Sequence, residues 1–141
     1  MSTSAIFIDA PRDVVWKAVT LPQYVRQWQF SSELTTDWRV GHPIRFSAAW
    51  EGQTFEQWGT VLAFDAPSLL RYSLFAPRPG LEDLPENYFT MTYELAVVDA
   101  GTRVTFIHED PRESDGEQDD GDEENPVLLA LREVAEAMHG D

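Results

Sequence analysis

Apolar and polar residues alternate along several separate segments of this chain, as they do in strands with one buried face. Residues 44–50 and 89–97 alternate most clearly, and shorter segments near Ile6, at 69–75 and at 103–109 also favour strands. Residues 54–64 form another expected strand, but they are apolar on both parities and do not indicate which face is buried. One face of the two clearest strands carries Ile44, Phe46, Ala48, Trp50, Phe89, Met91, Tyr93, Leu95 and Val97.

Helical spacing appears in two regions of the chain, and a proline stands at the start of each of the three helices expected there. Pro11 suits the first position of a helix, because its missing N–H has no partner there, and Pro22 ends that helix and starts a second one that closes at Trp28. Near the other end, Asn125 and Pro126 predict the start of a helix over 126–139. Its apolar stripe consists of Val127, Ala130, Leu131, Val134 and Met138.

The order of these elements is one strand, two short helices, about six strands in hairpin succession and one long C-terminal helix. We therefore predict an α+β fold, in which a curved antiparallel β-sheet wraps around the C-terminal helix. A curved sheet closed over one helix leaves space between them, and a pocket is expected there.

The composition is typical of a soluble protein, and residues 1–141 are expected to form a single domain. Hydrophobic residues make up 43% of the sequence, and no apolar run approaches the roughly 18 residues of a spanning helix, so we expect no membrane partner. The chain contains no cysteine. It also shows no secretion signal, and together these features favour a cytoplasmic location.

Charge is concentrated in one segment. The net charge is −15 at pH 7, and residues 109–124 carry −9 of it, from ten acidic residues and one arginine. Runs of like charge are usually solvated, so residues 110–124 are expected to form a mobile acidic loop. A lid over the pocket and an adaptation to salt are the alternative roles of this loop. Because no continuous basic face is present to neutralise phosphates, nucleic-acid binding is not expected.

Five sequence motifs together resemble the SRPBCC (START-like, helix-grip) superfamily, in particular its group similar to the C-terminal domain of the activator of Hsp90 ATPase (AHSA1-like). They are IxIDAPRDVVW at 6–16, Trp28, DWRVG at 37–41, GTVLAFDAPSLLRY at 59–72 and GTRVTFIHE at 101–109. The resemblance covers nearly the whole chain and implies the helix-grip fold. It departs before the last helix, where Glu124 to Val127 replace the Gly-Trp that the group often carries.

Aromatic residues make up 12% of the chain, and several occur at alternating strand positions. Such residues can line an apolar pocket, with tyrosine hydroxyls and an imidazole as its orienting polar groups, although a role in the core is the alternative for each of them. The predicted ligand-binding residues are Trp50, Trp58, Tyr72, Phe89, Met91, Tyr93, Phe106, His108, Leu131 and Met138.

Catalytic and metal chemistry find little support in the sequence. His108 is a candidate acid–base group because it shares the parity of Val104 and Phe106, but a strand-end histidine bonded to a neighbour or to water is the alternative. Three scattered histidines and no cysteine do not make a transition-metal set, and we expect no metal and no cofactor.

Three functions follow as hypotheses. The first is binding of a small apolar or aromatic molecule between the sheet and the C-terminal helix. The second is an enzyme of the cyclase, dehydratase or hydrolase type, because the resemblance implies relatives by fold that act on polyketide-like or aromatic substrates. In this chain His108 would serve as its general acid or base, with Tyr93 nearby. The third is an Hsp90 co-chaperone-like role with a protein partner, which rests on the resemblance alone. A monomer and a homodimer are both compatible with the sequence.

Overall fold

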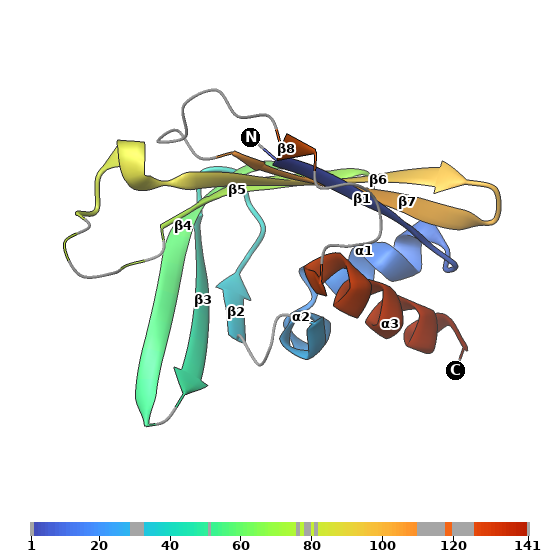
Figure 1. The fold of residues 1–141 in the computed structure, drawn as a ribbon, viewed down its shortest axis with the longest axis horizontal. Helices are drawn as coiled ribbons and strands as arrows, with labels where there is room; N and C mark the ends of the chain where they lie inside the picture. The colour runs from blue at the N-terminus through green and yellow to red at the C-terminus, as the bar shows by residue number, and fades with distance from the viewer. Residues whose placement is uncertain are drawn as a thin grey trace.

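The computed structural model describes residues 2–28, 33–50, 52–75, 77, 80, 82–109, 118–119 and 126–140 (Figure 1). Its elements follow the predicted order. They are β1 (Ser2–Ile8), α1 (Arg12–Thr20), α2 (Pro22–Trp28), β2 (Glu33–Thr36), β3 (Pro43–Trp50), β4 (Gln53–Asp65), β5 (Leu69–Leu74), a 3-10 turn η1 (Pro85–Asn87), β6 (Phe89–Val98), β7 (Gly101–Glu109), β8 (Gln118–Asp119) and α3 (Pro126–Gly140).

Within the described residues, eight strands form one sheet in the order β2-β3-β4-β5-β6-β7-β1-β8. Neighbouring strands are antiparallel, except that the two residues of β8 run parallel to Ser2 and Thr3 of β1. Strand β8 belongs to the acidic segment predicted to be a mobile loop, and the rest of residues 110–124 lies outside the described residues. Asn125, the predicted N-cap of α3, lies outside them as well.

Helices α1, α2 and α3 cover one face of the sheet, and the hairpin of β3 and β4 bends toward the same side (Figure 1). Helix α3 contacts β1, α1 and α2, so the C-terminal helix is the centre of the helical layer. We call the face that it covers the inner face. This arrangement confirms the predicted α+β fold with a curved sheet and a C-terminal helix.

Two tryptophan side chains donate hydrogen bonds to backbone carbonyl groups of α1. The indole N–H of Trp28, at the end of α2, donates to the carbonyl of Ala18 in α1 over 2.7 Å. Trp38 donates in the same way to the carbonyl of Thr20, the last residue of α1, over 2.9 Å. Both bonds satisfy carbonyl groups near the end of α1, which have no partner inside the helix.

Strand β4 changes its pairing between Val61 and Ala63, where the register with β5 shifts at a bulge. A bulge inserts one residue and so moves the following side chains to the other parity. Val61 consequently lies in the core and Phe64 packs against it, although their spacing is odd. The bulge explains why this segment is apolar on both parities.

At Gly59, β4 and β5 leave no room for a side chain between them. A Cβ atom at this position would lie 1.8 Å from the carbonyl oxygen of Ser73, so only glycine fits between these strands.

Candidate functional site

Strand register brings most of the predicted ligand-binding residues together on the inner face. Tyr72 of β5 pairs with Met91 of β6, and Met91 pairs with His108 of β7. Residues opposite each other in antiparallel strands point to the same side, so these three side chains form one row across the sheet. The next row contains Tyr93 and Phe106, which are paired in the same way.

Each row combines one buried tyrosine with half-buried neighbours. Tyr72 and Tyr93 are each 4% exposed, whereas Met91, Phe106 and His108 are half-buried. The apolar side chains of both groups pack in or against the same core, which also contains Leu131 of α3. Large half-buried apolar side chains on a helix-covered face provide the kind of surface that small-molecule sites use.

The two tyrosines supply a polar group inside this apolar region. Burial raises the pKa of Tyr93 well above its ordinary value of 10.0, and the nearby Tyr72 and a hydrogen bond between the two side chains raise it further. The Tyr93 hydroxyl therefore stays protonated at neutral pH. A buried neutral hydroxyl pair can orient a ligand by donating or accepting a hydrogen bond.

His108 lies at the end of β7, and its ring centroid is 4.9 Å from that of Phe89, the first residue of β6. Among the residues that the structure describes, no carboxylate is hydrogen-bonded to the imidazole. General acid–base catalysis usually uses a histidine that a second group holds in one orientation. The described surroundings of His108 thus contain an apolar neighbour and no orienting acid.

The remaining predicted site residues lie in different places. Leu131 is fully buried in α3, and Met138, two turns further along the same helix, packs against the core from a half-buried position. Trp58 lies on the other face of the sheet, where it pairs with the exposed Arg45, and the structure does not bring it to the rows. The side chain of Trp50 falls outside the described residues.

Three aromatic residues of the inner face were absent from the sequence-based set. Trp38 and Phe46 lie with their ring centroids 6.3 and 5.7 Å from that of Tyr72, and Phe64 stacks on Trp38 at 5.5 Å. The alternation through Ile44 and Phe46 was a usable signal for Phe46. Nothing in the local pattern identified Trp38, because it follows β2 with a positive φ of 57° instead of lying in a strand.

Two hollows open beside β2, away from the two tyrosine rows. One is lined by residues of α2 and β2, among them Arg26 and Glu33, and the other by residues of β2, β3 and β4, among them Arg45 and Trp58. Within the described residues, no three histidine, aspartate or glutamate side chains gather closely enough to hold a metal ion. The described helices include none that is long and apolar enough to cross a membrane.

Comparison with known proteins agrees with this architecture. The sequence profile of the family described as activator of Hsp90 ATPase homolog 1-like protein (AHSA1) matches residues 9–137. This chain belongs to that family. As an AHSA1-like protein it has the helix-grip fold that the residue motifs implied. None of the proteins with curated descriptions matches its sequence.

Several solved structures have a similar fold. ChR145 from Cytophaga hutchinsonii is 29% identical, with a TM-score of 0.67 over 99% of this chain and 88% of that one. CalU16 from Micromonospora echinospora is 26% identical, with a TM-score of 0.57 over 77% of this chain, which matches only 59% of CalU16. The Aha1 dimer from Colwellia psychrerythraea is 14% identical, with a TM-score of 0.65 over 95% of this chain and 94% of that one, and shows the fold alone.

Proposed function

We propose that this AHSA1-like protein binds a small apolar or aromatic molecule between the inner face of the sheet and α3. One observation carries the proposal: half-buried Phe89, Met91 and Phe106 lie on the helix-covered face, next to the buried hydroxyl pair of Tyr72 and Tyr93. An apolar surface with a few convergent polar groups is the usual composition of a ligand site. The family fold supports the same function.

Uptake of N-phenyl-1-naphthylamine, a neutral apolar fluorophore, tests this proposal. The wild-type protein should enhance its fluorescence, and Met91→Trp should reduce uptake because the larger side chain would occupy the proposed site beside Tyr72. Phe106→Trp should act similarly on the neighbouring row. Val97→Trp is the matched control, because Val97 lies on the same strand and is 60% exposed beyond the site. Equal uptake by all four proteins would refute the proposal.

Acid–base catalysis by His108 is a second candidate for the same site. It is favoured by the position of His108, which lies in the same row as Met91 and Tyr72 and against the ring of Phe89. Once a bound molecule is identified, turnover should disappear in His108→Gln while binding and the folded state persist. Turnover retained in that variant would leave binding as the function of the site.

A protein partner is the third candidate, and it rests on the family description. Isothermal titration calorimetry with an Hsp90 from the same host tests it directly, since the absence of heat at high concentration would dismiss it. The Colwellia neighbour is described as a dimer. Light scattering should therefore accompany both binding experiments, to establish whether this chain is a monomer or a homodimer.

A further inference from the structure

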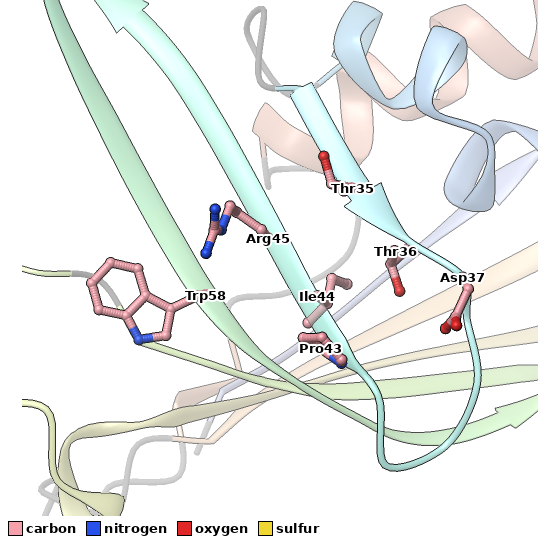
Figure 2. A pocket seen from close by; sticks show the side chains of 7 residues that line it. All are labelled: Thr35, Thr36, Asp37, Pro43, Ile44, Arg45 and Trp58. Carbon is pink, nitrogen blue, oxygen red and sulfur yellow. The ribbon is translucent and has the colours of Figure 1, made fainter.

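A hollow of about 410 Å³ lies on the surface formed by β2, β3 and β4 (Figure 2). We call it the outer hollow. Thr35, Arg45 and Trp58 come from three neighbouring strands and are paired directly across them. The outer hollow is lined by Thr35, Thr36, Asp37, Pro43, Ile44, Arg45 and Trp58.

The side chains of Thr35 and Arg45 in the outer hollow lie on the opposite face of these strands from the core. Leu34 and Phe46 pair with each other in the same strands and are buried in the core. Because successive residues of a strand point to opposite faces, Thr35 and Arg45 project away from that core. A molecule in the outer hollow would therefore not compete for the space around Tyr72 and Met91.

The rim of the outer hollow is held by a network of local hydrogen bonds. The backbone N–H of Trp38 donates to Oγ1 of Thr36, and that of Arg39 donates to Oδ1 of Asp37, both over 3.0 Å. The second oxygen of Asp37 lies 2.8 Å from Nδ1 of His42. Both carboxylate oxygens of Asp37 thus have partners within the turn.

Arg45 is the cation of the outer hollow, and its charge is only weakly compensated. Its closest carboxylate among the described residues is Glu56, at 4.0 Å, and the two side chains are 59% and 45% exposed. An exposed ion pair at this distance contributes little. The planar guanidinium therefore keeps N–H donors available for a carboxylate, the group that its fork geometry fits best.

Trp58 provides an aromatic surface in a fixed orientation. Its indole N–H donates to Asp83 over 3.1 Å, and Tyr88 donates to the other oxygen of Asp83 over 2.6 Å. Its ring also packs against Phe75, with centroids 5.4 Å apart. With its one polar atom already bonded, Trp58 offers the outer hollow only carbon surface.

We propose that the outer hollow is a second binding site, for a small planar carboxylate whose ring lies against Trp58 and whose charged group is bound by Arg45. The volume suits a molecule of one or two rings, since it lies near the lower end of the range for ligand sites. An amine of the same shape would meet the charge of Arg45, while the carboxylate of Asp37 is already engaged. The charge of Arg45 thus favours a carboxylate over an amine, despite the acidic composition of the chain.

The probe for this site is 2-naphthoate, followed through the indole N–H signals in two-dimensional NMR, with the Trp58 signal assigned by its loss in Trp58→Phe. Added 2-naphthoate should shift the Trp58 signal in a saturable way. In Arg45→Gln the affinity should fall about tenfold or more, as expected for a lost charge-assisted hydrogen bond. The neutral analogue 2-naphthalenemethanol should bind wild-type protein about as weakly as 2-naphthoate binds Arg45→Gln.

Two control variants distinguish binding in the outer hollow from a general charge effect and from binding at the inner face. Arg39→Gln changes the net charge equally at an exposed position that does not line the outer hollow, and should leave the affinity unchanged. Met91→Trp, which fills the inner face, should also bind 2-naphthoate as the wild type does. The proposal is overturned if 2-naphthoate leaves the Trp58 signal unshifted, if Arg45→Gln binds it normally, or if Met91→Trp abolishes its binding.

Discussion

Strand β4 passes through two parts of the molecule that use apolar residues differently. At its Asp65 end it joins the helix-covered sheet, where its neighbour Leu70 in β5 is fully buried. At its Gln53 end it forms the hairpin with β3, and Phe55 is 52% exposed although it lies on the same face as the buried Phe46. The helices cover only the first part (Figure 1). Burial of an apolar residue in this sheet therefore depends more on coverage by the helices than on residue type.

The largest expected effect is the difference in stability between alanine substitutions at Leu70 and at Phe55. Leu70→Ala should lower the free energy of unfolding by about 2–5 kcal/mol, because it leaves a cavity in a fully packed core. Phe55→Ala, which removes a larger side chain from the hairpin, should cost less than about 1 kcal/mol because little packing is lost. Urea unfolding measures both. Equal losses would mean that the hairpin is as tightly packed as the covered sheet.

A second contrast compares two indole hydrogen bonds. Trp28→Phe leaves the carbonyl of Ala18 without its buried partner, and should cost about 1–3 kcal/mol. Trp58→Phe removes an exposed bond to Asp83, and water can replace it, so about 0.5 kcal/mol is expected. Thermal unfolding of the two variants tests this order. A larger loss for Trp58→Phe would contradict it.

The loss of stability at alkaline pH gives a third contrast, which depends on the buried Tyr93 of the covered sheet. The pKa of Tyr93 is raised well above 10.0, first by burial, so an unfolded chain ionises this tyrosine before the folded one does. The stability that Tyr93 contributes is complete below pH 10 and is lost as the pH rises from there through its folded pKa. Unfolding measured against pH should therefore show a shallower alkaline loss in Tyr93→Phe than in the wild type.

Tyr88→Phe is the matched variant for that titration. Burial also raises the pKa of Tyr88, followed by its hydrogen bond to Asp83, but Tyr88 lies in the more exposed region beside Trp58. Its removal should change the alkaline slope less than the removal of Tyr93. An equal change in both variants would show that the Tyr72–Tyr93 pair is not the main source of the effect.

The smallest effect is expected at Asp37, on the rim of the outer hollow. The backbone N–H of Arg39 lowers the pKa of this carboxyl below its ordinary value of 3.8, and His42 lowers it further. Its favourable contribution is present above the ordinary carboxyl pKa and is lost as the pH falls through the folded pKa. NMR titration of the carboxyl carbon should show the lowered pKa, and Asp37→Asn should flatten the acid limb slightly. Asp99→Asn, in the β6–β7 turn, is the control.

The strands of the covered sheet were predictable from sequence because one face of each is buried. Alternation from Phe89 to Val97 places Tyr93 and Leu95 on the inner face, and both are buried there. Strand β4 was less informative, because its bulge after Val61 moves the apolar residues from one parity to the other. A single-sequence pattern does not contain the position of a bulge.

The sites were less predictable than the fold. Tyr72, Met91 and His108 share a row because three strands pair in one particular register, and that register follows from the turns between them as well as from the side chains. The position of Trp58 on the outer face was hidden by the same bulge that made β4 ambiguous. The short strand β2 went unrecognised, since four residues with one buried leucine, Leu34, give almost no periodic signal.

The lengths of the outermost strands have a consequence for behaviour in concentrated solution. Within the described part of the chain, the sheet ends in β2, with four residues, and in β8, with two. A long unpaired edge invites another copy to add its own strand, and so leads to aggregation. At the β2 end the edge strand is short, and Glu33 adds a charge to it. Sheet-to-sheet polymerisation is thereby disfavoured at the β2 end of this fold.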